Sequence, residues 1–323
     1  YNRNTNPELT KIKGLTAFSH VLTESNTTHK SVPMLMSSVT AHDFNSIYRQ
    51  KGIITAFKEA GYRTAFFSNQ RYNHSFIDFF GKEADICDFI KEDTGDGGYN
   101  PSDDELLKLV AAELAENVSK QFIVLHTYGS HFNYRERYPA DNAFFLPDFP
   151  VDAELKYKDN LINAYDNSIR YTDNFLARLI RMLQEQDIDA AMLYTSDHGE
   201  DIFDDDRHLF LHASPVPSYY QIHVPFLIWM SDNYRKNYPD LFKNAEINRQ
   251  KNISSSASFF QTMLELGGID TPSRNDSLSV INASYTEKNR VYLNDHNEAR
   301  SLNDIGMREE DFTMLQMKGI VYR

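Results

Sequence analysis

The 323-residue sequence predicts an α/β fold in which a doubly wound, mostly parallel sheet carries helices on both faces. Three observations lead to this prediction. Short apolar runs of strand length alternate along the chain with longer segments of helical period. The length suits a single large domain with a full core. The clearest apolar run ends in an adjacent carboxylate and imidazole, and such sheets gather their chemistry at the carboxyl ends of strands.

Individual elements follow from periodicity and capping residues. A long helix is predicted over about 155–185, where apolar side chains recur at helical spacing, and a second over about 103–118, after the N-cap Ser102. The segment 48–67 fits a helix, a C-terminal cap at Gly61 and then a strand. Runs rich in β-branched and aromatic residues predict strands at 64–68, 122–126, 192–195 and 225–229.

The overall charge argues against nucleic acid as a partner. The chain has 33 Lys and Arg residues against 46 Asp and Glu residues, a net charge of -13, which repels a phosphate backbone. No run of 18 apolar residues is present, so nothing in these residues is expected to span a bilayer. Cys87 is the single cysteine, which rules out an intrachain disulfide, and we expect it to be a small buried residue.

The run AAMLYTSDHGE at 190–200 is the most informative stretch, because it reads as a strand that ends in a metal site. Asp197 and His198 can share one ion only if the chain turns there, and Gly199 supplies the freedom to turn. A carboxylate oxygen and a neutral imidazole nitrogen suit zinc or manganese. The alternative is an N-cap aspartate beside a surface histidine.

A possible nucleophile lies near the start of the chain. Residues 24–36 are first polar and then apolar, which suggests a helix beginning near Thr28. A helix start aims free N–H groups and a positive dipole end at its first residues and therefore favours a phosphate. A hydroxyl held there against a divalent cation loses its proton more readily and becomes a nucleophile. The alternative is that Thr27 or Thr28 is only an N-cap.

Two further histidines are expected near the same edge of the sheet. His131 follows the predicted strand 122–126 across a Gly-Ser turn, and His212 lies 14 residues beyond His198, far enough for a loop to fold back. His126 lies within the strand and is expected to be a hydrogen-bonded core residue.

Seven motifs in this order resemble those of the phosphoethanolamine transferases of the alkaline phosphatase superfamily, which include the lipid A-modifying enzymes of polymyxin resistance. The resemblance covers nearly the whole chain, from Thr5 to Asp295. Seven ordered matches are far more specific than any one of them. The motifs are N-P at 6–7, T-x-x-S-V-P at 28–33, G-S-H at 129–131, R-Y-P at 137–139, Y-D-N-S-I at 165–169, S-D-H-G-E at 196–200 and L-H at 211–212.

The resemblance implies a nucleophile and a metal site. Thr28 matches the threonine that takes up phosphoethanolamine, and Asp197 and His198 match ligands of the zinc that also binds the threonine oxygen. One zinc ion, or two, is implied in preference to manganese.

The resemblance also implies further contacts to the substrate. His131 and His212 match histidines that face the substrate phosphate or a second zinc. Asn69 or Gln70 resembles a polar contact to the donor.

The implied reaction transfers phosphoethanolamine from phosphatidylethanolamine, through a phosphothreonine intermediate, to a hydroxyl of lipid A, core oligosaccharide or another envelope glycan. The implied location is the periplasmic face of the inner membrane. A phosphoglycerol transferase of the lipoteichoic acid synthase type, or a non-catalytic envelope-binding domain of the same fold, is the alternative. Sulfatase activity is not expected, because neither Cys87 nor any serine begins the C/S-x-P-x-R motif that sulfatases need.

The sequence departs from the family in two respects. Family members carry a Gly-Glu-Ser or Gly-Glu-Thr motif on their first strand, and its glutamate is the fourth zinc ligand. Residues 1–7 resemble the stretch that follows this motif. We therefore expect residues 1–323 to be a catalytic domain that lacks this strand and the membrane helices before it. Many lipid A-type members also have several disulfides in this domain, which a chain with one cysteine cannot form.

Overall fold

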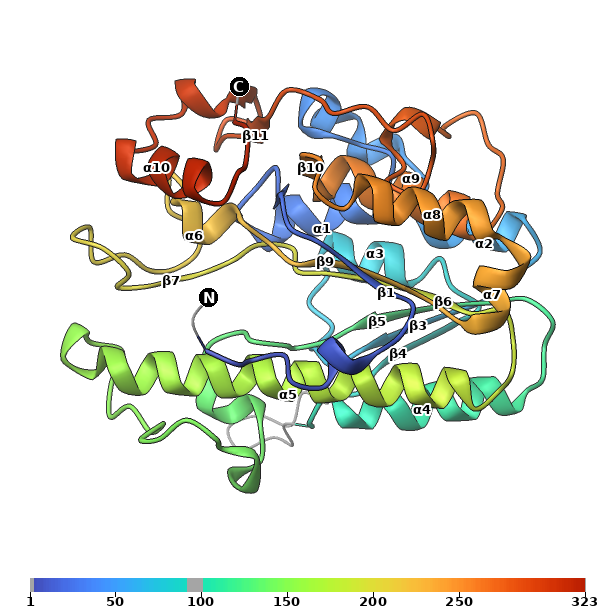
Figure 1. Ribbon diagram of the computed structural model, residues 1–323, viewed down its shortest axis with the longest axis horizontal. Helices are drawn as coiled ribbons and strands as arrows, with labels where there is room; N and C mark the ends of the chain where they lie inside the picture. Colours follow the sequence, from blue (N-terminus) through green and yellow to red (C-terminus); the bar gives the residue numbers. More distant parts are fainter. Residues whose placement is uncertain (1–2, 92–100, 323) are drawn as a thin grey trace.

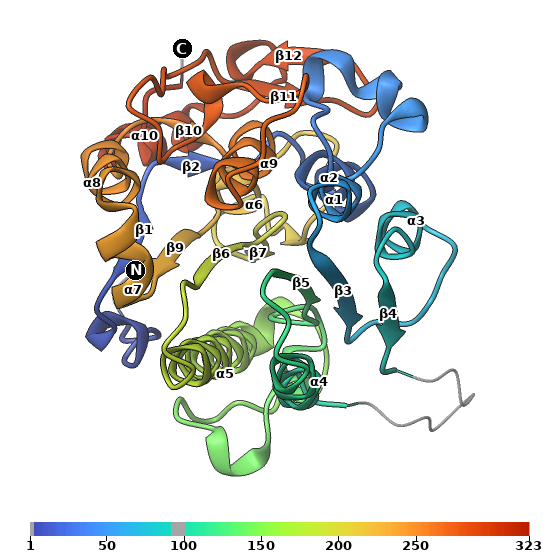
Figure 2. The same ribbon diagram turned by 90° about the vertical axis from the view of Figure 1, so that its right-hand side faces the viewer.

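The computed structural model describes residues 3–91 and 101–322 and has strands in the centre with helices on both faces (Figures 1 and 2). This arrangement confirms the predicted doubly wound α/β class. Figure 2 shows the two helical layers most clearly. One face carries α4 (Asp104–Ala115) and α5 (Lys158–Gln184), and the other carries α1 (Thr28–Met36), α2 (Ile53–Glu59), α8 (Pro239–Asn248) and α9 (Ser255–Leu266).

The central strands form two three-stranded sheets. In the first, β3 (Arg63–Ser68) lies between β4 (Ile86–Phe89) and β5 (Gln121–His126) and is parallel to both. The second has the order β1, β9, β6, with β9 antiparallel to both of its neighbours. The strands of the second sheet are β1 (Leu15–Phe18), β6 (Ala191–Thr195) and β9 (Phe226–Met230).

Smaller elements surround this centre. The short strands pair as β2 with β10, β7 with β8 and β11 with β12. Their bounds are β2 (Val21–Leu22), β7 (Asp201–Ile202), β8 (Phe210–Leu211), β10 (Ile253–Ser254), β11 (Val291–Leu293) and β12 (Ala299–Ser301). The remaining α-helices are α3 (Phe76–Gly81), α6 (Tyr219–Ile222), α7 (Asp232–Asn237) and α10 (Glu309–Met317). Among the residues that the structure describes, none of the helices is both long enough and apolar enough to cross a membrane.

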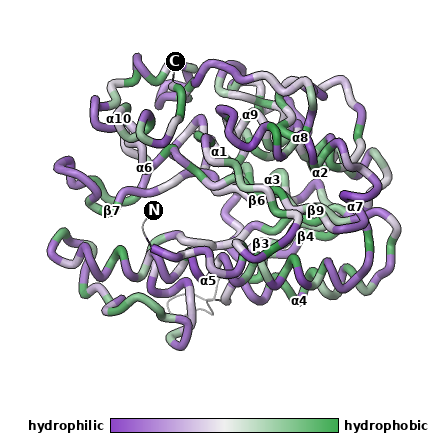
Figure 3. Tube along the Cα trace, in the orientation of Figure 1, coloured by the Kyte–Doolittle hydropathy of each residue, from purple (hydrophilic) through white to green (hydrophobic). Residues whose placement is uncertain are grey.

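The longest helix, α5, shows how the pattern of apolar residues produces the packing. Its buried face includes Leu161, Leu176 and Ile180, whereas charged side chains such as Arg178 are half exposed. Figure 3 shows the same alternation of hydrophobic and hydrophilic residues along the helix. The predicted helix at 155–185 is confirmed, although residues 155–157 form a short 3₁₀ turn before it.

The four predicted strands and the C-terminal cap of α2 are also confirmed. Gly61 follows α2 with a φ of +82°, in the left-handed region that favours glycine. Two expectations need correction. β9 runs antiparallel inside a sheet expected to be mostly parallel, because the chain between β6 and β9 forms β7, β8 and the short α6 instead of a long crossover helix. Cys87 is exposed rather than buried, because its strand β4 lies at the sheet edge.

The arrangement of the two three-stranded sheets positions the polar site residues. The sheets lie edge to edge between the same helical layers, with β5 facing β6 (Figure 2). The carboxyl ends of β5 and β6 both point toward the left of Figure 1. The loops that follow these two strands therefore meet on one side of the molecule.

Candidate active site

The site begins at the N-terminus of α1. Thr27 is the extended N-cap residue, and its carbonyl accepts hydrogen bonds from the backbone N–H groups of Lys30 and Ser31. The Thr27 hydroxyl makes no capping bond and lies 3.1 Å from Ser25 Oγ. Thr28 is the first helical residue. Its hydroxyl therefore lies among the free N–H groups of the first turn, as the sequence predicted.

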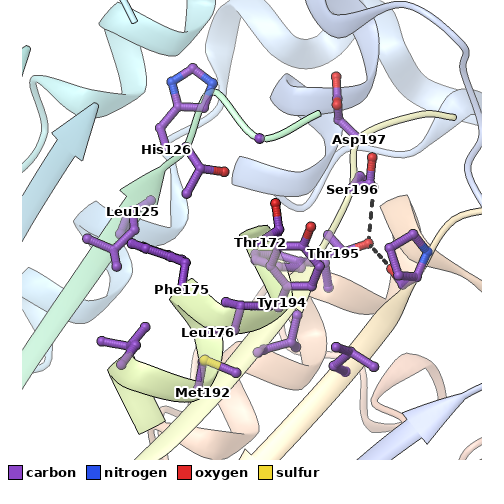
Figure 4. A pocket seen from close by; sticks show the side chains of 18 of the residues that line it. Leu125, His126, Thr172, Phe175, Leu176, Met192, Tyr194, Thr195, Ser196 and Asp197 are labelled. Atoms are coloured by element: carbon purple, nitrogen blue, oxygen red, sulfur yellow. Dashed lines mark hydrogen bonds between the residues drawn. The ribbon is translucent and has the colours of Figure 1, made fainter. Parts of the chain in front are cut away.

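The Thr28 hydroxyl meets the strand-end pair directly. Thr28 Oγ1 lies 3.0 Å from His198 Nε2, and His198 Nε2 lies 3.4 Å from Asp197 Oδ2. Ser31 Oγ, one turn along α1, donates to Asp197 Oδ2 at 3.1 Å. The three side chains expected to share one ion thus converge from residues 170 positions apart. Figure 4 shows Asp197 at the end of a pocket lined by β5, β6 and α5.

A hydrogen bond to the backbone fixes the orientation of the His198 ring. Its Nδ1 donates to the carbonyl of Gly199 at 3.0 Å, which leaves Nε2 as the acceptor that faces Thr28. His198 is only 8 % exposed, so water does not compete for this arrangement. Burial alone raises the pKa of Asp197, but the neighbouring His198, Thr28 and Ser31 outweigh it and hold the pKa below its usual value. Asp197 is therefore a carboxylate at neutral pH.

Gly199 has a different role from the one expected. A Cβ atom there would overlap the carbonyl oxygen of Tyr220, and the Gly199 N–H donates to the carbonyl of Gln221 at 2.9 Å. The backbone of Gly199 packs directly against α6, which leaves no space for a side chain. Glycine is thus needed for close approach and not for a left-handed turn.

His212 joins the site through Glu200, a residue that the sequence reasoning did not single out. The His212 and His198 rings lie 3.9 Å apart between centroids, and His212 Nδ1 lies 3.1 Å from Glu200 Oε1. The Glu200 side chain is 6 % exposed, and its other oxygen accepts a short hydrogen bond from Tyr134. The carboxylate therefore orients the His212 ring, with Nδ1 toward Glu200 and Nε2 on the other side of the ring. Only the position of Glu200 directly after the Asp-His-Gly motif could have indicated from the sequence that it belongs to the site.

His131 lies at the outer rim of the same site. Its ring is 6.2 Å from that of His212 between centroids and 5.2 Å from that of Tyr128. The residue is exposed, and its Nδ1 lies 2.6 Å from the carbonyl of Phe132. The structure thus brings His131, His212 and His198 into one row of imidazoles.

His126, expected in the core, makes a 3.0 Å hydrogen bond with Ser68 between the ends of β5 and β3.

Asn69 and Gln70 take different positions. Asn69 is 1 % exposed, and its amide donates to the Asp103 carboxylate at 2.7 Å. Asp103 in turn accepts the backbone N–H groups of Tyr128 and Gly129, so Asn69 supports the loop that carries His131. Asn69 therefore lies behind this loop instead of beside Thr28. Gln70 lies along the wall of the pocket.

A buried polar network holds the loop in front of α1. The Asn26 amide donates to Gln221 Oε1 at 2.6 Å and accepts from the Tyr292 hydroxyl at 2.6 Å. Gln221 donates to Asp201 Oδ2 at 2.7 Å, next to the strand-end motif. Burial raises the pKa of Asp201 to about 6. The network connects the loop before α1 to the segment that follows the Asp-His-Gly motif. No short sequence pattern indicated these contacts.

The donor set fits part of a zinc site. Asp197 Oδ2, His198 Nε2 and Thr28 Oγ1 supply two oxygens and one nitrogen at one point, which is the chemistry zinc prefers. Within residues 3–91 and 101–322, no group of three or more His, Cys, Asp or Glu side chains is arranged to hold a metal. A zinc ion at this point would therefore depend on the threonine and on at least one donor beyond the Asp-His pair.

The role of Glu200 can be tested by Glu200→Gln, which keeps the shape of the side chain and removes its charge. We expect a 10- to 100-fold lower kcat, as is usual when a supporting partner is lost, with KM unchanged. The control is Glu298→Gln, a half-exposed carboxylate that pairs with Arg300. A lower Tm with an unchanged kcat would show that Glu200 is merely structural.

The fold and the position of the site define an α/β domain of the alkaline phosphatase and sulfatase type. Residues 1–269 match the sequence pattern of the Sulfatase family. The chain therefore belongs to the sulfatase family. In the C-terminal periplasmic domain of EptC from Escherichia coli, solved in complex with Zn, the same fold recurs with a TM-score of 0.84 and 22% identity. That match covers 95% of this chain and 88% of the other.

Curated relatives have names that agree with one another. The Kdo(2)-lipid A phosphoethanolamine 7''-transferase of E. coli strain K12 is 30% identical over 258 residues, which is 78% of this chain and 45% of that protein. Phosphoethanolamine transferase EptC of E. coli strain RS218 is 25% identical over 301 residues, 90% of this chain and 51% of that protein. The chain thus spans about half the length of these relatives. The lipoteichoic acid synthase LtaP of Listeria monocytogenes is structurally more distant, with a TM-score of 0.57 and 17% identity.

Proposed function

We propose that this chain is the catalytic part of a zinc-dependent phosphoethanolamine transferase. It takes phosphoethanolamine from phosphatidylethanolamine and passes it to a hydroxyl of an envelope glycolipid or glycan, such as lipid A or core oligosaccharide. The reaction takes place at the periplasmic face of the inner membrane. Relatives named as phosphoethanolamine transferases and the Zn-bound EptC domain support this proposal.

One observation carries the proposal. Thr28 is a hydroxyl at the N-terminus of a nine-residue helix, 3.0 Å from His198 and beside the ionised Asp197. Thr28 is the first helical residue and not the N-cap, which is Thr27, and its hydroxyl is directed at the strand-end pair. A phosphate placed there would meet the free N–H groups of α1 and the positive end of its dipole.

The reaction has two displacements. Thr28 Oγ forms a bond to phosphorus, and the bond between phosphorus and the glycerol oxygen of the lipid breaks, which releases diacylglycerol. Bound zinc would lower the pKa of the Thr28 hydroxyl and offset the negative charge of the phosphate. His212, oriented by Glu200, holds a proton at Nε2 for the leaving oxygen, and His131 is placed to assist at the rim. The acceptor hydroxyl then displaces Thr28 from phosphorus.

The experiment compares two lipid donors in detergent with the full-length protein and zinc. Fluorescent phosphatidylethanolamine and phosphatidylglycerol are supplied in turn, and the release of fluorescent diacylglycerol is measured. We expect at least tenfold faster release from phosphatidylethanolamine. Faster release from phosphatidylglycerol would favour the lipoteichoic acid type of reaction, for which the fold of LtaP is the precedent. Release from neither donor would favour a binding domain.

A further inference from the structure

A loop near the active site exposes many large apolar side chains. Fifteen large hydrophobic residues are exposed in the described part of the chain, and five of them lie between positions 144 and 155. Four of these, Phe144, Leu146, Phe149 and Val151, are 63 to 76 % exposed. Such clusters on a protein surface mark sites of interaction with membranes or partners. Residues 144–155 are called the apolar loop below.

Buried asparagines hold the backbone of the apolar loop in place. Asn167 of α5 is fully buried, and its Oδ1 accepts the backbone N–H groups of Phe144 and Phe145 at 2.9 and 2.8 Å. Asn163, one turn earlier and also buried, donates to the carbonyl of Pro147 at 2.8 Å. These bonds tie the backbone to α5, so the apolar side chains are held outward in a defined arrangement. Their exposure is therefore a built feature of the fold.

Both ends of the apolar loop lead to the rim of the active site. The chain reaches the loop after Tyr134, whose hydroxyl donates to Glu200, the partner of His212. It continues into α5 at Lys158, which donates to the carbonyl of Phe203 at 2.5 Å, just after β7. Figure 1 shows this green segment below the left half of α5, on the side toward which the carboxyl ends of β5 and β6 point. A surface that contacts the loop therefore lies on the same side of the molecule as the reacting groups.

Charged side chains of both signs surround the apolar loop. The guanidinium of Arg170 lies 4.1 Å from the centroid of the Phe144 ring, and Lys156 forms an ion pair with Glu154. Asp152 is exposed in the same loop. Basic side chains beside inserted aromatic rings are placed to meet lipid phosphates, and carboxylates can meet the ammonium group of an ethanolamine headgroup. This mixture suits a zwitterionic ethanolamine lipid better than an anionic lipid, which favours a purely basic surface.

The shape of the apolar loop favours a bilayer over a protein partner. Phe149 and Val151 are more than two-thirds exposed, so they stand on a convex surface where neighbours cover little of them. A bilayer accommodates a convex apolar surface, because the side chains enter between the acyl chains. In a two-fold dimer the same convex surface would meet itself, which would leave most of these side chains uncovered.

We propose that the apolar loop inserts into the surface of a bilayer rich in phosphatidylethanolamine and so holds the active site at the level of the lipid headgroups. This inference rests on the proposed function, in which the donor is such a lipid, and adds the surface through which the domain meets its donor. Interfacial segments bury their apolar side chains about 5 to 10 Å deep, which reaches the upper part of the acyl chains. Phe149 and Val151, the most exposed of the five, are expected to reach deepest.

Fluorescence quenching by labelled lipids tests the insertion. In the full-length protein, Cys87→Ser removes the single cysteine of residues 1–323, Val151→Cys introduces a new one, and an environment-sensitive dye is attached there. The protein is placed in phosphatidylethanolamine-rich vesicles, with or without lipids that carry a nitroxide near the top of the acyl chain. We expect about twofold or stronger quenching by the nitroxide and protection from iodide in the water. The matched control is Ile247→Cys on α8, which is 60 % exposed in the opposite helical layer and should be quenched by iodide alone.

A lack of nitroxide quenching at position 151 would overturn the proposal. A dye shielded from both quenchers would show that protein covers the loop, and shielding that increases with protein concentration would identify a second copy as the cover. The measurement requires no catalysis. It therefore remains decisive for the loop even if the proposed transferase reaction fails its own test.

Activity provides a second measurement, which separates docking from catalysis. Phe149→Ser combined with Val151→Ser should raise the apparent KM for phosphatidylethanolamine in vesicles by about tenfold or more, because two apolar anchors are lost. The rate with a short-chain phosphatidylethanolamine dissolved as monomers should not change. The control Ile247→Ser should alter neither value. An unchanged KM in vesicles, or equal losses with both donors, would overturn the proposal, since equal losses would mean that the loop supports the site itself.

Discussion

Thr28→Val should reduce phosphoethanolamine transfer by at least about 1,000-fold, because the substitution removes the oxygen that would attack phosphorus. Valine has nearly the shape of threonine, so α1 should keep its position. The Tm should change by only a few degrees, since loss of the hydrogen bond to His198 costs about 1 kcal/mol. The measurement is the rate of diacylglycerol release from phosphatidylethanolamine by the full-length protein.

The matched control is Thr27→Val, one residue earlier in the chain. The Thr27 hydroxyl contacts Ser25 and not the strand-end pair, so this variant should retain transfer within a fewfold. Equal losses in the two variants would show that the hydroxyls support the helix start instead of the chemistry. Full activity of Thr28→Val would remove Thr28 from the reaction.

Asp197→Asn should lower the affinity for zinc by more than about 100-fold. Loss of a supporting partner alone commonly costs 10- to 100-fold, and loss of a charged ligand should cost more. Asparagine can still accept the hydrogen bond from Ser31, so the local fold should persist. The measurement is zinc retained by the purified protein against a competing chelator, at a pH near 7.

The control for Asp197→Asn is Asp206→Asn, which removes an exposed carboxylate that pairs with Arg308 outside the site. This variant should retain zinc as the unmodified protein does. If Asp197→Asn also retains zinc at the same chelator concentration, the metal is held elsewhere. Transfer should fall in parallel with zinc content, and adding excess zinc should restore part of the activity.

The sequence predicted the framework because the relevant signals are local. The strands β3, β5, β6 and β9 are short apolar runs, and α5 is a long amphipathic segment. The position of Asp197 and His131 at one edge follows from the rule that chemistry gathers at the carboxyl ends of strands. The hydroxyl of Thr28 could be placed beside them only through the resemblance, since 170 residues separate it from His198.

The parts that could not be predicted depend on contacts between distant residues. Glu200 orients His212 because Tyr134, from a different loop, holds its second oxygen. Asn69 supports the His131 loop through Asp103, although the resemblance implied a contact to the donor for Asn69 or Gln70. In both cases, the role of the residue depends on which side chain from a distant part of the chain it contacts. Neither spacing nor residue type contains that information.

The central claim is that Thr28 carries the transferred group. The direct measurement is peptide mass spectrometry of the full-length protein after brief incubation with phosphatidylethanolamine and zinc, without an acceptor. We expect phosphoethanolamine attached to the oxygen of Thr28 and absent from Thr27. Modification of a different residue, or diacylglycerol release with an unmodified Thr28 at every time point, would contradict the claim.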